Sequence, residues 1–565
     1  MRIVFPIRAA RLAISLMLCS ALAGHAQIFD TSTAPAGPSA YVPIDSWVYS
    51  AFDSLAAEGY VPTAFSSLRP WTRNECARLT QEAEDQMMES QPAGSESRRF
   101  VEALEREFAP ELGDSDPARP RWQMESIDQR TTVITGQPLT DGFHFAETLT
   151  NDEGRPFGRG VNLYSGLSMR GSAGPFAGYI RTEFQRAAAA PAPGAFAQQQ
   201  IAAADFTSPA AAGPISGIAR GRVLEGYISF GFAHNQLTFG RQSLWWGPGR
   251  SGATLFSNNA EPIDMLRYDR VRPFLLPGFL RMIGPIRGQL LIGRLSGTQF
   301  LRPTSTLYGR PGFALGDEPF LHGEKISFHP TANLEFSGSR TTIFGGPGAP
   351  VTMASFLLSL FSPSIVNGKN DPGDRRFAFD AKYRIPGMRS CLTGYFDGFS
   401  EDQVFPLLYP TESAWIPGFT LRCFPHAPQL TFRAEGLLSP HRNLEFPGFF
   451  YFNIHYLSGY TNQRQLIGSW IGREANGEQL WTTWNLSPRS SLEISGRSMT
   501  VSKDFLSGGS LRDLRVNANL AIRPAWQLVA EEQTEWWRFP LLSAAPQHNA
   551  AFTVQLSYRP VARVP

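Results

Sequence analysis

The chain has 565 residues, more than one ordinary soluble domain needs, and its formal net charge is only +2. This balance gives no sign of the strongly charged surface that binds nucleic acid. Aromatic residues make up 12% of the sequence, with 42 Phe and 12 Trp beside 52 Gly and 44 Pro. Such a composition is typical of many short strands joined by turns.

Residues 1–26 have the pattern of an export signal peptide. The arginines Arg2, Arg8 and Arg11 come first, and a short apolar run follows at residues 12–22. Small residues at 24–26 are suited to cleavage before residue 27. The alternative is a membrane anchor, but the apolar run is too short to favour it. No later segment approaches 20 apolar residues without charge, so we expect the exported chain to lack a membrane-spanning helix.

Three regions follow the signal. Residues 27–43 are rich in Pro, Ala and Ser and predict a flexible lead. Residues 44–115 carry the apolar spacing of short helices. From about residue 120 to residue 565 the apolar period changes to two, which indicates strands.

The helical region carries recognisable start and stop signals. Asp45 is suited to cap a first helix that ends at Gly59, and Thr72 with Glu75 forms a capping box for a second. Residues 98–108 predict a third. A bundle of about 70 residues is only marginally stable alone, so we expect it to dock on a larger unit.

The strand region alternates apolar and polar side chains. Ile180 and Phe184, for example, alternate with Arg181, Glu183 and Gln185. Roughly 18 to 20 such segments occur, many of about ten residues, the length with which a tilted strand crosses a bilayer. The fold class is therefore predicted as mainly β, a large antiparallel transmembrane β-barrel with a small N-terminal α-helical bundle.

Arg181, Glu183 and Gln185 are expected to line the barrel lumen. A solvated network without ligand is favoured there over a selectivity filter. One further clean apolar strand face is predicted for Leu224, Gly226, Ile228, Phe230 and Phe232.

Two other architectures have similar sequence patterns. A soluble β-sandwich array also has short alternating strands, and a propeller would show a repeat of about 40 residues, which this sequence lacks. The signal peptide and the aromatic-ended strands favour one barrel. The long connections are predicted at 187–221, 243–285, 300–323 and 400–416.

Three cysteines remain after the signal: Cys76, Cys391 and Cys423. An odd number without a close pair excludes a disulfide framework and a zinc site. Cys391 and Cys423 can form a bridge between neighbouring strands in an oxidising periplasm, but two buried thiols are the favoured interpretation.

Residues 237–259 read L-T-F-G-R-Q-S-L-W-W-G-P-G-R-S-G-A-T-L-F-S-N-N and are the most informative stretch of the chain. Two adjacent tryptophans beside a rigid turn are costly to leave in water. We expect them to pack against lipid, neighbouring loops or the flat faces of sugar rings.

This stretch resembles the Wzi family of capsule assembly proteins, at residues 241–249 and 255–259. The helical segments 42–60 and 68–79 look like the bundle of that family, and Gly459-Tyr460-Thr461-Asn462 with the run I-G-S-W-I-G at 467–472 looks like a later loop motif. The resemblance implies an outer-membrane barrel of about 18 strands with a periplasmic bundle and extracellular long loops. It also implies a lectin-like role, in which capsular or related polysaccharide is held at the cell surface.

Polar and aromatic groups of the motif suit sugar binding, because indole rings stack on C–H faces while amides and guanidiniums bond hydroxyls and carboxylates. The alternative is structural: paired tryptophans often anchor a strand end or pack a loop into a barrel. The candidate polysaccharide-binding residues are Arg241, Trp245, Trp246, Arg250, Asn258 and Asn259.

Other functions find less support. A polar lumen also suits a diffusion channel, and a hydrolase site can be assembled from distant strands. The sequence has no H-E-x-x-H motif, no G-x-S-x-G elbow and no phosphate loop. We therefore expect a non-enzymatic monomer in outer-membrane lipid, with polysaccharide as partner and no cofactor or metal.

Overall fold

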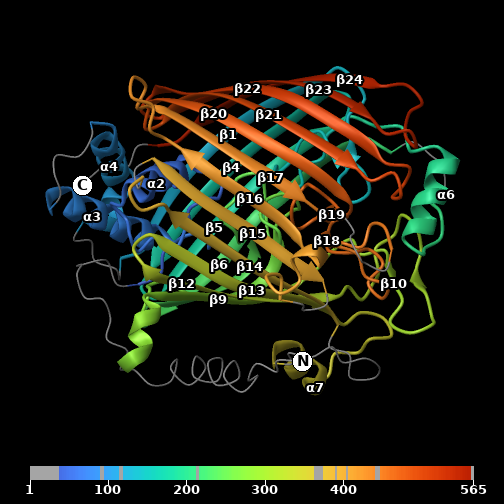
Figure 1. The fold of residues 1–565 in the computed structure, drawn as a ribbon, viewed down its shortest axis with the longest axis horizontal. Helices are drawn as coiled ribbons and strands as arrows, with labels where there is room; N and C mark the ends of the chain where they lie inside the picture. Colours follow the sequence, from blue (N-terminus) through green and yellow to red (C-terminus); the bar gives the residue numbers. More distant parts are fainter. Residues whose placement is uncertain are drawn as a thin grey trace.

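The computed structural model describes residues 37–89, 95–113, 119–210, 215–361, 373–388, 391–401, 405–439 and 446–560. The predicted signal peptide lies outside these residues. The chain forms one large barrel with a group of helices against one end (Figure 1). No described helix is long and apolar enough to cross a membrane.

Eighteen strands close the barrel, as predicted. Each strand pairs antiparallel with the next barrel strand along the chain, and β24 returns to β1 with Ile127 opposite Tyr558. The strands are β1 (Arg121–Ile134), β4 (Gly160–Ala173), β5 (Phe176–Ala187), β6 (Ile218–Phe232), β7 (Asn235–Gln242), β8 (Ile263–Arg270), β9 (Ile286–Arg294), β12 (Phe320–Thr331), β13 (Leu334–Phe344), β14 (Asp374–Arg384), β15 (Leu392–Glu401), β16 (Ala414–Leu421), β17 (Leu430–Leu438), β20 (Ala475–Ser487), β21 (Ser490–Val501), β22 (Gly509–Arg523), β23 (Trp526–Arg538) and β24 (Gln547–Tyr558).

Shorter helices and strands lie outside the barrel wall. The helices are α2 (Trp47–Glu58), α3 (Arg73–Glu89), α4 (Ser95–Glu107), α5 (Ala109–Leu112), α6 (Ala195–Ala204) and α7 (Met353–Phe361), with 3-10 turns η1 (Gly278–Ile283) and η2 (Pro410–Glu412). The two-residue strands are β2 (Thr140–Asp141), β3 (Ala146–Glu147), β10 (Phe300–Leu301), β11 (Tyr308–Gly309), β18 (Thr461–Asn462) and β19 (Gln465–Leu466).

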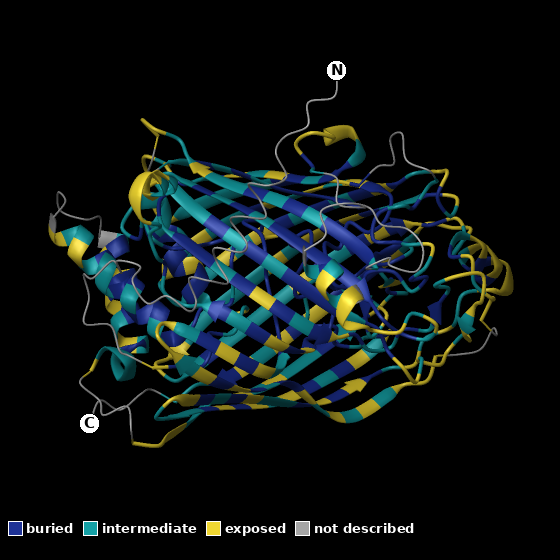
Figure 2. Cartoon of the chain, turned by 90° about the horizontal axis from the view of Figure 1, so that it is seen from below, coloured by how far each residue is buried: buried dark blue, intermediate teal, exposed yellow. Residues whose placement is uncertain are grey.

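The strands expose apolar side chains and bury polar ones, the reverse of a soluble sheet (Figure 2). On β5, Ile180 and Phe184 are exposed, whereas Glu183 and Gln185 between and after them are buried. Ser229 and Thr238 are likewise buried and face each other at 2.9 Å across β6 and β7. An apolar outer wall around a polar interior is the pattern of a barrel that sits in lipid.

One residue departs from the single apolar face predicted for β6. Leu224 is fully buried, although Ile228 and Phe230 on the same strand are exposed. The register between β5 and β6 shifts here, because Arg181 pairs with Glu225 and Thr182 with Val223, which leaves Leu224 unpaired in a bulge. A bulge adds one residue to a strand and so reverses the alternation.

The two ends of the barrel differ. Tight turns, such as β4–β5 and β20–β21, lie at the end with α2, α3 and α4, while long connections and α6 lie at the opposite end (Figure 1). The connection predicted over 187–221 contains α6 and the start of β6, and that over 243–285 contains β8. Strands as short as β7 and β8, at eight residues each, are hard to recognise by alternation.

The helical bundle follows the predicted segments closely. Ser46 rather than Asp45 caps α2, since its hydroxyl accepts from Val48 N, and Gly59 ends the helix with a φ of 93° that suits glycine. Thr72 caps α3 by accepting from the Glu75 N–H at 3.2 Å. The third helix begins at residue 95, earlier than predicted.

The bundle is fastened to the inner wall. The loop between α2 and α3 gives four donors to the buried carboxylate of Glu335 on β13, from the N–H and hydroxyl groups of Ser66 and Ser67, at 2.6–3.0 Å. Residues 38–42, predicted as part of a flexible lead, are buried, and the Tyr41 N–H donates to the Tyr227 hydroxyl at 2.9 Å. Because these donors and acceptors are buried, the contacts hold the bundle in one position.

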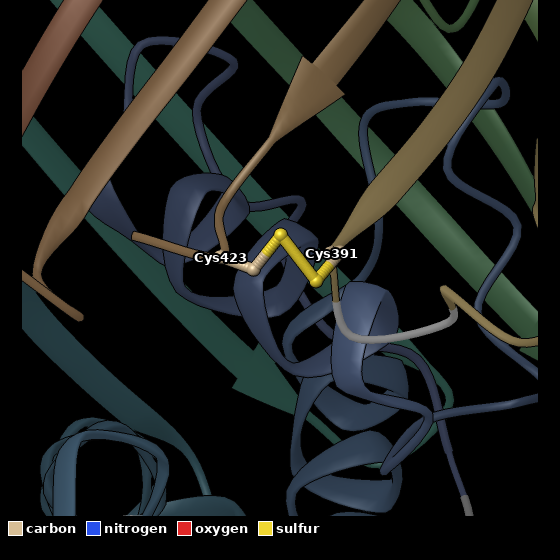
Figure 3. The surroundings of a disulfide bond; sticks show 2 residues. All are labelled: Cys391 and Cys423. Carbon is tan, nitrogen blue, oxygen red and sulfur yellow. A yellow bond between two sulfur atoms is a disulfide. The ribbon is translucent and has the colours of Figure 1, made fainter. Parts of the chain in front are cut away.

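The expectation of two free thiols was wrong. Cys391 and Cys423 form a disulfide that joins the start of β15 to the end of β16, beside the bundle helices (Figure 3). Leu392 and Leu421 pair across these neighbouring strands, so the barrel register brings the two thiols together. Cys76 is free and buried in the bundle.

Candidate functional site

Two loops, 243–262 and 446–474, fold inward and fill the long-loop end of the barrel as one unit, here called the plug. Its apolar core contains Trp246, Phe256 and Tyr451, packed against inner-wall residues such as Leu321 and Phe399. Burial of this many rings is the main force that holds the loops inside the barrel.

The two tryptophans of the motif lie inside the plug. Trp246 is 1% exposed, donates from Nε1 to Gln289 of β9 at 2.8 Å, and packs edge-on against Phe256. Trp245 is 7% exposed and exchanges two backbone hydrogen bonds of 3.0 Å with Arg69 of the bundle. The pair thus connects the plug to the wall and to the bundle.

Acidic residues of the wall hold the Gly-Pro-Gly segment that follows. Glu435 of β17 accepts from Arg250 N at 2.7 Å, from Ser251 N at 2.9 Å and from the Ser251 hydroxyl. Asp397 of β15 accepts from Thr254 N and Oγ1 at 2.8 and 2.7 Å. Each carboxylate satisfies backbone donors that burial would otherwise leave without water.

The two asparagines of the motif join the plug to other loops. The Asn258 carbonyl accepts from Glu153 N at 2.7 Å, and the Asn259 side chain accepts from Asn151 N at 3.2 Å. Both asparagines are buried, and Oδ1 of Asn258 has no hydrogen-bond partner among the described atoms.

The two arginines lie apart from this group. Arg241 is on the outer side of β7 and forms an ion pair of 2.8 Å with Asp264 of β8. Arg250 is 40% exposed, pairs with Glu493 at 2.8 Å and stacks over Trp481. The six sequence-predicted residues therefore do not converge on one cleft: four build the plug, one lies on the outer wall and one lies at the edge of the plug.

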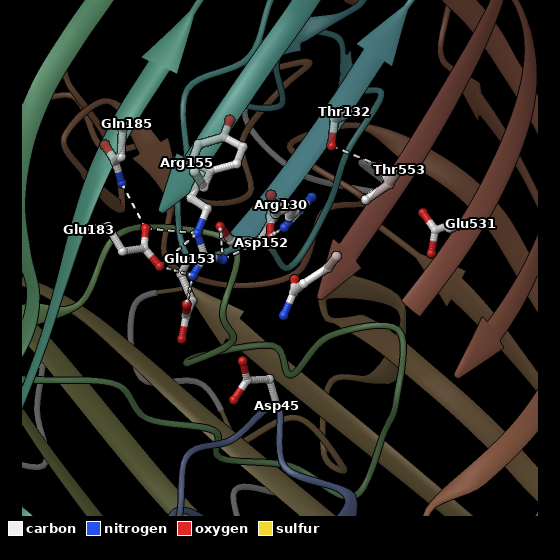
Figure 4. Close-up of polar contacts among 12 residues, drawn as sticks. Asp45, Arg130, Thr132, Asp152, Glu153, Arg155, Glu183, Gln185, Glu531 and Thr553 are labelled. Atoms are coloured by element: carbon white, nitrogen blue, oxygen red, sulfur yellow. Dashed lines mark hydrogen bonds and ion pairs between the residues drawn. The ribbon is translucent and has the colours of Figure 1, made fainter. Parts of the chain in front are cut away.

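The predicted lumen residues belong to a charged network around Arg155 of the loop after β1 (Figure 4). Arg155 Nη2 binds Glu183 at 2.6 Å and Glu153 at 2.7 Å, and Gln185 donates to Glu183 at 3.2 Å. Arg181 binds Glu153 at 3.3 Å. The charges of this network are largely paired with one another, and Glu153, Arg155 and Glu183 are buried.

Further residues of this network were not predicted from the sequence. Asp152 accepts from Arg155 at 2.9 Å and from Arg130 of β1 at 2.6 Å. Asp152 and Arg155 lie in a loop without periodicity, so the sequence offers no signal that singles them out.

An aromatic and cationic cluster, here called the rim cluster, lies where three long connections meet. Phe206, just after α6, is 46% exposed, with Phe446 and Phe452 of the plug loop at ring-centroid distances of 6.1 Å. The Arg302 guanidinium lies 5.7 Å from the Phe206 ring centroid. A partly open ring beside a guanidinium is an arrangement that suits a sugar carrying a carboxylate.

The connection that carries Phe206 is fixed by a buried charge cluster. His144 binds Asp141 and Asp205 at 2.7 Å each, and Asp205 also binds Arg473 of the plug at 2.5 Å. Burial alone would lower the pKa of His144, but the two carboxylates raise it to about 10. The imidazolium therefore stays charged at neutral pH and holds the rim to the plug.

The sequence pattern of the family described as capsule assembly protein Wzi matches residues 129–552, most of the chain. The chain belongs to the Wzi family. The match begins within β1 and ends within β24, so it covers nearly the whole barrel.

Two known proteins are similar to this chain. A solved structure from Escherichia coli, of Wzi, an outer membrane protein involved in group 1 capsule assembly and a carbohydrate-binding β-barrel, has a TM-score of 0.64 at 14% identity and covers 93% of this chain and 100% of its own. An uncharacterized 55.8 kDa protein in the cps region of Klebsiella pneumoniae is 26% identical over 181 residues, 31% of this chain. The match spans about a third of that relative, 32% of its length.

The segments that resemble the Wzi family meet in space. The Ser257 N–H of the first motif donates to the Ile467 carbonyl of the later one at 3.0 Å, and the Tyr451 hydroxyl donates to the Thr254 carbonyl at 2.7 Å. The bundle segment joins them through Arg69 and Trp245. In this Wzi barrel the three resembling segments are thus parts of one packed structure.

Proposed function

We propose that this chain is an outer-membrane barrel that binds capsular or related extracellular polysaccharide at the cell surface. In this orientation the bundle lies in the periplasm, and the long connections with the rim cluster lie outside. Membership of the Wzi family carries the proposal, and the exposed apolar wall supports a place in outer-membrane lipid.

The rim cluster is the proposed contact surface. Phe206 and Phe446 offer ring surface for the C–H faces of sugars, and Arg302 offers donors for uronic acid carboxylates. Of the sequence candidates, Arg250 keeps a partly exposed guanidinium, but its partner Glu493 lies only three residues after the start of β21. We therefore place Arg250 on the bundle side of the plug and outside the contact surface. We assign the buried Trp245, Trp246, Asn258 and Asn259 to the shaping of the plug, and Arg241 to the outer wall.

Glycan-array binding tests the proposal. The variant Phe206→Ala/Arg302→Gln is expected to lose about tenfold or more in affinity for acidic polysaccharide, because it removes a stacking surface and a charge-assisted donor. The matched control is Phe313→Ala/Arg310→Gln, which removes another ring–guanidinium pair on the connection that carries Arg302, with the guanidinium 3.9 Å from the ring centroid. Equal binding by wild type and both variants, with the heat-dependent gel shift of a folded barrel intact, would rule out the rim cluster.

A diffusion channel is the second candidate, favoured by the polar interior. Steady conductance of the wild-type protein in planar bilayers would support it, whereas the plug predicts a closed pore. We assign the protein no catalytic step and one copy per functional unit. Product formation from capsule fragments, or a dimer in native mass spectrometry, would contradict these assignments.

A further inference from the structure

A cavity of about 620 Å³, here called the vestibule, lies at the bundle end of the barrel, far from the rim cluster. It lies between the bundle and the inner wall. Its lining comes from the start of α2, from α4, from inward positions of β1, β4 and β5, and from the β20–β21 and β22–β23 turns. Because these strand positions point away from lipid, a ligand reaches the vestibule through water.

The lining is strongly cationic. Seven arginines and four carboxylates surround the cavity. Three of the carboxylates are already paired with arginines: Asp45 with Arg181 at 3.3 Å, Glu107 with Arg73 at 2.9 Å, and Glu125 with Arg170 at 3.5 Å. The fourth carboxylate, Asp128, shares the cavity with the four remaining arginines, so positive charge is in excess.

Arg489 and Arg559 are the centre of this excess charge. The Arg489 guanidinium donates to the Pro524 carbonyl at 2.8 Å, and its buried Nε has no partner among the described atoms. Within the described part of the chain, Arg523 and Arg559 make no side-chain hydrogen bond or ion pair. Burial and the neighbouring Arg559 lower the pKa of Arg489, while Glu107 acts in the opposite direction.

The start of α2 adds to the positive potential. Asp45, Ser46 and Trp47 line the vestibule, so the N-terminal end of a 12-residue helix lies at the cavity. The N–H groups of a helix N-terminus carry a partial positive charge that favours anions, and the Ser46 hydroxyl accepts from one of them here, Val48 N. The helix end and the free guanidiniums are independent features at the same cavity.

We propose that the vestibule binds an oxyanion, a phosphate or carboxylate group carried by a soluble molecule on the bundle side of the barrel. Arginine forks bind both groups through paired, charge-assisted hydrogen bonds. Anion binding in the vestibule does not depend on the proposed function at the cell surface. Only the statement that the bundle side is periplasmic rests on that proposed function.

Titration calorimetry in a neutral detergent tests the proposal, with inorganic phosphate in one arm and glucuronate in the other at constant ionic strength. The double variant Arg489→Gln/Arg559→Gln is expected to lose about tenfold or more in affinity for whichever anion binds the wild type. Arg523→Gln, on an exposed turn, is expected to show a smaller loss and covers the case in which the double variant does not fold. Binding of phosphate alone or of glucuronate alone supports the proposal and names the ligand class.

The matched control is Arg512→Gln, an exposed arginine near the start of β22 that does not line the vestibule, and it should bind like wild type. Absence of binding to the wild type in both arms overturns the proposal, as does an equal affinity in Arg489→Gln/Arg559→Gln. Glycan-array binding of the double variant separates the two sites, because a functional rim cluster leaves it unchanged.

Discussion

The Ser257 hydroxyl donates a hydrogen bond of 2.7 Å to the carbonyl oxygen of Gly468, a residue 211 positions later in the chain. This bond joins the Trp-Trp motif loop to the loop that carries the second motif. Both loops then pack on the inner wall as one plug. The integrity of the plug can be tested separately from that of the barrel.

Gly468→Ala is expected to loosen the plug. An alanine Cβ at this position would lie 2.3 Å from the Thr254 carbonyl oxygen, so the two loops must separate, at a cost of about 1–3 kcal/mol. Limited proteolysis of the long connections should become faster while the gel shift of the barrel is retained. Gly394→Ala is the control, since its Cβ would meet no described atom within 4 Å; equal proteolysis of the two variants would contradict the prediction.

Trp246→Ala is expected to open the plug further. The substitution removes a fully buried indole and its hydrogen bond to Gln289, which costs about 3–5 kcal/mol. Conductance in planar bilayers should rise above that of the wild type. The control Trp484→Ala removes an indole that is 53% exposed on the outer wall, and no rise is expected there.

Glu435→Ala is expected to destabilise the Gly-Pro-Gly segment. Three donors of residues 250 and 251 and the Tyr395 hydroxyl would lose their acceptor, at a cost of about 1–3 kcal/mol for each donor left buried. Thermal unfolding should therefore shift to lower temperature. Glu478→Ala removes an exposed glutamate and is expected to leave the transition unchanged.

Alkaline pH is expected to release the connection around α6. The folded-state pKa of His144, about 10, lies above its ordinary value of about 6.5. Its contribution is therefore complete below about pH 6.5 and is lost as the pH rises through 10. Proteolysis of the 188–217 connection should accelerate near pH 10 in the wild type, and His144→Gln should be cleaved rapidly at every pH. A wild type without any such transition would count against the charge cluster.

Reduction of the disulfide is expected to lower stability without opening the barrel. A cross-link between residues 32 positions apart restricts the unfolded chain by about 3–4 kcal/mol. Dithiothreitol should lower the unfolding temperature of the wild type and leave Cys391→Ser/Cys423→Ser unaffected. Cys76→Ser keeps the cross-link and serves as the control. Any loss of stability in this variant before reduction arises from its buried hydroxyl, and dithiothreitol should still lower its unfolding temperature.

The sequence alone determined the barrel and the bundle. Alternation such as Ile180, Arg181, Phe184 and Gln185 fixes which side chains face lipid, and helix caps such as Thr72 and Gly59 are local signals, so both can be found without knowledge of distant residues. The Wzi motifs could also be recognised, because they are contiguous in the chain.

Only the tertiary structure decided what those motifs do. The burial of Trp246, the Cys391–Cys423 bond, the bulge at Leu224 and the vestibule around Arg489 all depend on which strands become neighbours. Register and loop packing are long-range properties, set by pairings between residues far apart in the chain, and no local pattern encodes them. For that reason a pair of tryptophans that could have been an open sugar platform proved to be the centre of the plug.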